Sequence, residues 1–247
     1  MINNHNHDHD HDHEPPVFTN RKQGLRNNNK RMSFFQTLNA RTTRTFRPKA
    51  LDSKQRSALQ EYATATLGSD ALREAVKLPV GEDENEWVAV HINDFYNQIN
   101  MLYSTINRLC TEQTCPKMIA TEEYEYLWQD SSSEEYRKPT HVSAPQYIEL
   151  LMAWVQRQFD NKDYFPTALG KEFSKSAPAM FKQILKRLFR VYAHIYCHHF
   201  EQITEVGLQP HLNTSLKHFV LFCNQFDLVD RAEYGPLSEL LELLERE

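Results

Sequence analysis

Hydrophobic side chains recur at steps of three and four residues over most of the chain after residue 50, a spacing typical of amphipathic helices. Over residues 86–110 this pattern is unbroken and predicts one long helix. The apolar positions that define it are Val88, Ile92, Phe95, Ile99, Leu102 and Ile106. Similar patterns predict helices at 53–69, where Ser53 is the N-cap and Gly68 lies near the C-terminal end, and at 144–159, 178–205, 212–226 and 235–247.

One segment has a different pattern. Residues 123–145 alternate between apolar and polar positions, pass through three consecutive serines and then resume, which predicts a small β-hairpin. The expected fold class is therefore all-α: a helical bundle that carries one β-hairpin.

The first fifty residues lack this periodicity. Residues 1–31 form a His- and Asn-rich extension that we expect to be disordered, although its alternating histidines could chelate transition metals weakly. Residues 32–50 are expected to form a flexible basic arm, and residues 51–247 a single helical domain.

Charge is distributed unevenly along the chain. The net charge is -5 overall, but residues 21–49 contain nine Lys or Arg and no acid. A basic arm attached to an acidic body indicates either an arm that docks on its own domain or a body whose partner is basic. The acidic body also argues against nucleic acid as a partner.

Other classes of protein are excluded by simple features. No apolar run approaches the ~18 residues of a membrane span, and the first twenty residues carry His and Asp where a signal peptide would be apolar. The 4 cysteines are too few for a disulfide framework in a chain of 247 residues.

Two cysteines and a histidine cluster suggest a metal site. Cys110 and Cys115 lie in one short loop, and the stretch 191–200 contains His194, His198 and His199. Zinc binds two thiolates and two imidazoles tetrahedrally, and a shell filled by four protein ligands is structural. At about 100° per residue, an ideal helix places His194 and His198 on one side and His199 among the apolar residues. The residues alone therefore leave open whether the site exists and which histidines complete it.

The same predicted helix carries three cations, Lys186, Arg187 and Arg190. An ideal helical wheel gathers them on the face opposite the core. They would form either a phosphate-binding cluster, since guanidinium groups bind phosphate oxygens in a bidentate manner, or a simple solvated basic face.

Several collinear motifs resemble the MOB family of kinase activators (Mps-one-binder coactivators). They are "LPVGEDENEWVAVHINDFYNQINMLY", "CTEQTCP", "EYEYLW", "SAPQYIELLMAW", "ILKRLFRVYAHIYCHHF" and "HLNTSLKHF". The resemblance runs from about Met32 to the C-terminus and is closest to the class that partners LATS-type and mitotic-exit kinases. It implies a helical bundle with one structural Zn²⁺ and no catalytic residues.

The resemblance also implies roles for particular residues. The zinc ligands would be Cys110, Cys115, His194 and His199, which differs from the choice of His198 by the ideal wheel. The family's phosphopeptide site falls on Lys186, Arg187 and Arg190. Its kinase-binding surface falls on Glu82, Glu86, Trp87 and Asp94, although the acidic residues before and within the first helical turn would also favour the helix dipole.

The resemblance implies two partners. One would be an NDR/LATS-family AGC kinase, bound through its N-terminal regulatory segment. The other would be a phosphorylated upstream kinase or scaffold in mitotic-exit or Hippo-type signalling. Neither nucleic acid nor membrane insertion is expected. The protein would be cytoplasmic, recruited to spindle poles or the division site, with the nucleus as a further location.

Phosphorylation is implied at Thr45, within the basic arm, and at Thr66. A phosphate on Thr45 would add negative charge among cations and could release an arm that lies over the acidic kinase-binding surface. A chain beginning at Leu51 would then bind the kinase segment more tightly.

Two alternatives to a kinase coactivator remain. A zinc enzyme would need an open metal position and a nearby acid, and the histidine cluster lacks the H-E-x-x-H pattern of zinc hydrolases. A phosphopeptide-binding scaffold that activates no kinase would carry the same three cations and is distinguished only by its partners.

Overall fold

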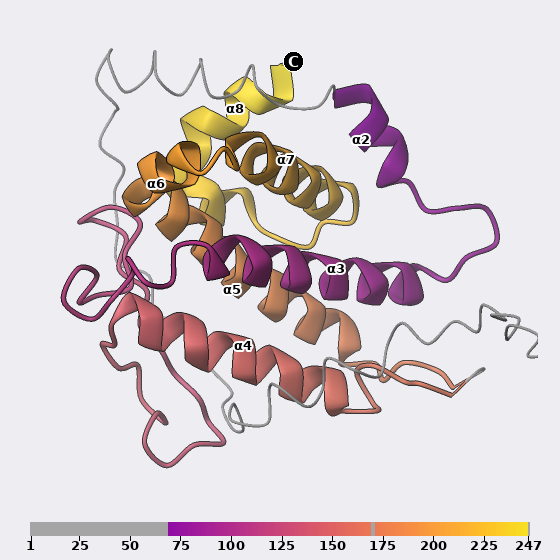
Figure 1. Cartoon of the computed structure of the whole chain (residues 1–247). Helices are drawn as coiled ribbons and strands as arrows, with labels where there is room; N and C mark the ends of the chain where they lie inside the picture. Colours follow the sequence, from indigo (N-terminus) through magenta and orange to yellow (C-terminus); the bar gives the residue numbers. More distant parts are fainter. Residues whose placement is uncertain (1–68, 169–170, 247) are drawn as a thin grey trace, which may run out of the picture. The chain divides into compact units, whose positions relative to one another are not determined.

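The structure is a computed structural model of the chain, and it describes residues 69–168 and 171–246. Most of the described chain is helical (Figure 1). The elements are α2 (Ser69–Ala75), α3 (Glu84–Ser104), α4 (Ala144–Asp160), α5 (Ala177–His198), α6 (Phe200–Glu205), α7 (Gln209–Gln225), the 3-10 helix η1 (Arg231–Leu237) and α8 (Ser238–Arg246). The helix predicted at 53–69, the His-rich extension, the basic arm, Thr45 and Thr66 lie outside the described residues.

Helix α3 begins where its sequence provides a cap. The side chain of Asp83 accepts a hydrogen bond from the backbone N–H of Glu86 at 3.0 Å, which satisfies one of the free donors of the first turn. The helix ends at Ser104, six residues before the predicted end. There the hydroxyls of Ser104 and Thr105 donate to the carbonyls of Met101 and Leu102, so local side-chain bonds replace the next helical turn.

Helix α4 matches its prediction closely because its start is encoded locally. Ser143 caps it by accepting from the N–H of Gln146 at 3.3 Å, and Pro145 occupies the first turn, where its missing N–H costs nothing.

The predicted helix 178–205 is divided into two. Helix α5 ends at His198, and α6 begins at Phe200. His199 lies between them with a φ of -133° and a ψ of 14°, outside the α-helical region.

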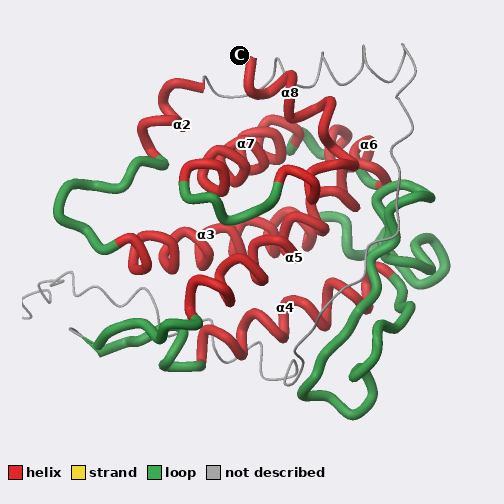
Figure 2. The backbone as a smooth tube through the Cα atoms, turned by 180° about the vertical axis from the view of Figure 1, so that it is seen from behind, coloured by secondary structure: helices red, strands yellow, loops and turns green. Residues whose placement is uncertain are grey.

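Helix α5 is the central element of the bundle. It packs against α3, α4, α6 and η1, while α7 packs against α2, α3, α6 and α8. In the front view, α5 runs obliquely behind α3, with α4 below and α7 above (Figure 1), and Figure 2 shows the same helices from behind. Consequently α5 is buried on almost every side from Leu188 to Tyr196.

The predicted β-hairpin is not present in the described residues. Instead, residues 117–142 form an extended loop with two isolated antiparallel bridges, Ile119 with Glu125 and Trp128 with Thr140. The backbone of this loop pairs with several segments in turn: Tyr126 donates to Met118, and Met118 donates to Val142. Because each pairing lasts for one residue, no continuous ladder forms, and the alternating apolar side chains are buried by the helices.

Within the described residues, no helix is both long enough and apolar enough to cross a membrane.

Candidate metal centre and cation cluster

The loop that carries both cysteines is held by short-range hydrogen bonds. Thr114 donates from its hydroxyl to the carbonyl of Leu109 at 2.6 Å, and the N–H of Cys115 donates to the carbonyl of Thr111 at 2.8 Å. These contacts fold the chain after α3 into a compact turn that aims both buried thiols at the C-terminal end of α5.

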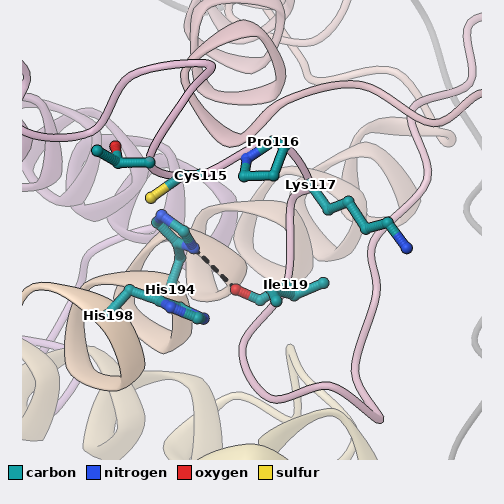
Figure 3. Close-up of a pocket in the computed structure, with 7 residues that line it drawn as sticks. Cys115, Pro116, Lys117, Ile119, His194 and His198 are labelled. Atoms are coloured by element: carbon teal, nitrogen blue, oxygen red, sulfur yellow. Dashed lines mark hydrogen bonds between the residues drawn. The ribbon is translucent and has the colours of Figure 1, made fainter.

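His194 is oriented by a backbone contact. Its Nδ1–H donates to the carbonyl oxygen of Ile119 at 2.8 Å, drawn as the dashed line in Figure 3. The opposite ring nitrogen, Nε2, lies 3.5 Å from the sulfur of Cys110. A second partner on Nδ1 that fixes the ring is the usual arrangement for a metal-binding histidine.

His199 completes the group because α5 ends just before it. Its Nε2 lies 3.4 Å from the sulfur of Cys115. An ideal helix would have turned this ring toward the core, whereas the non-helical backbone at His199 redirects it toward the cysteines. His198 is exposed and lies outside the group, on a small pocket that Lys117 and Ile119 also line (Figure 3).

The four residues Cys110, Cys115, His194 and His199 fit a tetrahedral metal. Their ligand atoms all lie within 4.8 Å of one another, and all four residues are buried. A tetrahedral Zn²⁺ with bonds of about 2.3 Å to sulfur and 2.0 Å to nitrogen places sulfur and nitrogen roughly 3.5 Å apart. The two sulfur–nitrogen distances above agree with this value. The group could therefore hold one metal ion, with all four positions supplied by protein.

Burial shapes the protonation of these ligands. It lowers the pKa of His194 to about 3 and that of His199 to about 4, so both imidazoles are neutral and able to bind a cation. Burial also raises the pKa of the Cys110 thiol to about 12 in the metal-free chain. Metal binding would therefore release thiol protons.

The cation cluster, defined as Lys186, Arg187 and Arg190, is not the exposed face that the ideal wheel predicts. Only Lys186 is partly exposed, whereas Arg187 and Arg190 are 2% and 3% exposed. The wheel assumes one buried face, and α5 is covered on several sides at once.

Arg187 is held by aromatic rings. Its guanidinium carbon lies 4.2 Å from the ring centroid of Trp154 and 5.2 Å from that of Trp128. Both terminal nitrogens, Nη1 and Nη2, are buried without a hydrogen-bond partner. Burial lowers the pKa of Arg187 to about 9, which leaves the group charged at neutral pH.

Some of the hydrogen-bond donors of Arg190 have partners. Arg190 donates from Nη1 to the hydroxyl of Tyr147 at 2.9 Å, and its guanidinium lies 5.0 Å from the ring centroid of Tyr126. Its Nε has no hydrogen-bond partner. The cluster therefore contains several buried donors and few acceptors.

Glu233, on η1, is the acid that faces this cluster. Its carboxylate lies 2.8 Å from Nζ of Lys186 and 3.9 Å from Nη2 of Arg190. A second acid, Asp130, is fully buried and pairs instead with Arg157 at 3.5 Å.

The residues of the acidic surface (Glu82, Glu86, Trp87 and Asp94) lie at the start of α3 and along it. The three acids are exposed. Trp87 is half-buried: its indole N–H donates to the carbonyl of Val76 at 3.3 Å, and its ring packs 4.3 Å from that of His91. Trp87 therefore ties the end of α2 to α3 as well as presenting one edge to solvent.

Comparison with known proteins shows the family to which the chain belongs. A profile of the Mob1/phocein family matches residues 64–237. The chain belongs to the Mob1/phocein family.

Individual members of the Mob1/phocein family are similar in sequence to this chain over most of its length. The chain is 50% identical over 203 residues to "Maintenance of ploidy protein mob1" of Schizosaccharomyces pombe, covering 82% of this chain and 96% of that protein. It is 51% identical over 204 residues to "MOB kinase activator-like 1 homolog A" of Dictyostelium discoideum, covering 82% and 95%. It is 53% identical over 191 residues to "DBF2 kinase activator protein MOB1" of Saccharomyces cerevisiae, covering 76% of this chain but 60% of that protein. The last two names describe kinase activators rather than enzymes.

Sequence reasoning missed part of the environment of the cation cluster in this Mob1/phocein chain. Tyr147, Trp128 and Trp154 pack around the cations from α4 and the preceding loop, and Glu233 approaches from η1. The available signal was composition: Trp128 and Trp154 lie within segments that carry the family motifs, as does Trp87, the third of the chain's 3 tryptophans.

Proposed function

We propose that this chain is a non-catalytic coactivator of an NDR/LATS-family serine/threonine kinase, and that it also docks a phosphorylated upstream kinase or scaffold. The coarser part of this proposal, a role in activating a kinase, is supported by the names of the relatives, which include a DBF2 kinase activator.

The observation that carries the docking function is the state of Arg187. A buried guanidinium with both terminal nitrogens unpartnered is costly, because each missing hydrogen bond leaves a desolvated donor. An anion that reaches these donors would recover that cost. A phosphate is the matching ligand, since its oxygens accept from a guanidinium in a bidentate manner.

The acidic surface is the proposed site for the kinase segment. Exposed Glu82, Glu86 and Asp94 complement a basic segment, and Val90, 54% exposed on the same helix, offers an apolar contact beside them. The half-buried indole of Trp87 would act as the anchor at the centre of this contact.

The proposed metal is Zn²⁺ with a structural role. The donor set of two thiols and two imidazoles favours zinc, and four protein ligands leave no position for water or substrate. The ion would join the loop after α3 to the end of α5, which is also the helix that carries the cation cluster.

The test uses two separate ligands. A phosphothreonine peptide library and a purified N-terminal segment of an NDR/LATS-type kinase are each titrated against the full chain. Asp94→Lys should abolish binding of the kinase segment and leave phosphopeptide binding unchanged. Kinase activity is then measured with and without the chain. Phosphopeptide binding without kinase binding or activation would favour the alternative, a phosphopeptide scaffold. Absence of both would refute the proposed function.

A further inference from the structure

Glu233 places a carboxylate of the chain itself within the cation cluster. Its side chain is 13% exposed, and it contacts both Lys186 and Arg190. The neighbouring residue helps to fix its position, because the ring of Tyr234 packs edge-on against Phe189 of α5, with centroids 4.9 Å apart. The carboxylate is therefore held on the cluster by the fold of η1 and not by a flexible surface side chain alone.

The charges of the cluster do not balance. Lys186, Arg187 and Arg190 supply three positive charges and Glu233 supplies one negative charge. The other charged pair nearby, Asp130 with Arg157, is neutral as a pair. Among the described residues Arg187 makes no direct ion pair: the charge of Asp130 acts on it from a longer distance, and the two nitrogens at its tip have no acceptor. Lys186, Arg187, Arg190 and Glu233 together carry a net charge of about two positive units, which is close in magnitude and opposite in sign to the charge of a phosphothreonine near neutral pH, about -1.5 to -2.

We propose that Glu233 is an internal counter-ion that makes the cluster selective for a dianionic phosphate over a carboxylate. This inference rests on the proposed docking of phosphorylated partners. A glutamate or aspartate of a partner carries one negative charge and two oxygens, the same as Glu233. It must compete with an acid that is already tethered at the site, and tethering confers a high effective concentration.

A phosphate differs in charge and in the number of its acceptors. Its second charge matches what Glu233 leaves uncompensated, and its three oxygens can reach donors on Arg187 and Arg190 that a carboxylate would leave unpaired. The chain would therefore not bind partner segments in which Glu or Asp stands in place of a phosphorylated residue. Docking would depend on phosphorylation of the partner by a kinase.

The test compares two peptides on one protein. The tightest-binding member of a phosphothreonine peptide library is selected with the wild-type chain and resynthesised with Glu in place of phosphothreonine. Wild type should bind the phosphopeptide and show no measurable affinity for the Glu peptide. Glu233→Gln, which keeps the shape and removes the charge, should bind the phosphopeptide about tenfold more tightly and gain measurable affinity for the Glu peptide.

Two further variants separate charge from structure. Glu233→Asp keeps the charge and should remain selective. Glu205→Gln makes the same charge change on α6, which begins beyond the C-terminal end of α5, and should behave as wild type. Thermal unfolding of each variant shows whether the fold is retained.

The outcomes are distinguishable. If no library peptide binds the wild-type chain, the proposed docking function fails and this inference fails with it. If the peptide binds but Glu233→Gln leaves its affinity unchanged or weaker, docking stands and the counter-ion role is wrong. Equal binding of the Glu peptide by wild type would overturn the selectivity directly.

Discussion

The imidazole of His194 donates its Nδ1 hydrogen to the carbonyl oxygen of Ile119, and this single contact decides which nitrogen faces the cysteines. With Nδ1 occupied, only Nε2 is free to bind a metal, and it lies 3.5 Å from the sulfur of Cys110. The backbone of the loop after α3 thus orients a candidate ligand on α5, and the same loop carries the two thiols.

Replacing His199 should remove the metal, whereas replacing His198 should not. His199→Ala deletes a nitrogen 3.4 Å from the sulfur of Cys115, while His198 lies outside the group. Elemental analysis of the purified proteins should find about one zinc per chain in wild type and His198→Ala, and little in His199→Ala. The metal-depleted variant should also unfold several degrees lower, because a clamp between distant segments is lost. Retention of zinc by His199→Ala together with its loss from His198→Ala would mean that the ideal helical wheel was the better guide.

Arg187→Met should separate docking from stability. Methionine fills the space between Trp128 and Trp154 without a charge that must be buried, so the melting temperature should stay constant or rise. Affinity for a phosphothreonine peptide should fall at least about tenfold, since a charge-assisted hydrogen bond contributes roughly 1.5–3 kcal/mol. The matched control is Lys182→Met, on the same helix one turn before Lys186, where the pair with Asp227 is exposed. A large loss of stability in Arg187→Met would show that the guanidinium is a structural element of the core.

The chain should lose stability in acid partly through His218. Burial, reinforced by the nearby charge of His91, lowers the pKa of His218 to about 4. Its ordinary value is about 6.5. As the pH falls from about 6.5 toward 4, the unfolded chain therefore binds a proton that the folded chain does not, and the free energy of unfolding decreases.

His218→Phe removes this proton and should keep the packing. The ring of His218 lies edge-on to that of Phe95, with centroids 5.0 Å apart, and its Nε2 has no hydrogen-bond partner that a phenyl ring would lose. Near pH 7 the variant and wild type should have similar urea midpoints. Near pH 5 the variant should be more stable by about 2 kcal/mol. Parallel loss of stability in both proteins would assign the acid sensitivity to other groups.

The parts of the fold that follow from local sequence were predictable. The start of α4 depends on Ser143, its N-cap, and on Pro145 in its first turn. The spacing of the apolar residues in α3 predicts which face of that helix is buried. The predicted hairpin is reduced to a single bridge between Trp128 and Thr140, because alternation shows only that every second side chain is buried. Tyr126 instead donates to Met118, which lies outside the predicted segment.

The geometry of the candidate site could not be predicted locally, because it depends on contacts between distant parts of the chain. The choice between His198 and His199 depends on where α5 ends, which an ideal wheel does not contain. The burial of Arg187 depends on two tryptophans from other segments, and the contact of Glu233 with Lys186 joins α5 to a 3-10 helix much later in the sequence. No local pattern predicts such contacts.

Arg190 and His194 are one helical turn apart on α5, roughly 6 Å along its axis. Under the proposed function, the residue that would bind the partner's phosphate and the residue that would bind the metal therefore lie on one helix, which the ion would anchor at its C-terminal end. A chain that lacks the proposed ion would still contain every residue of the cation cluster and of the acidic surface. It would lose the tie that fixes the positions of those residues, so under the proposed function the supply of the metal would become a condition for docking of the phosphorylated partner.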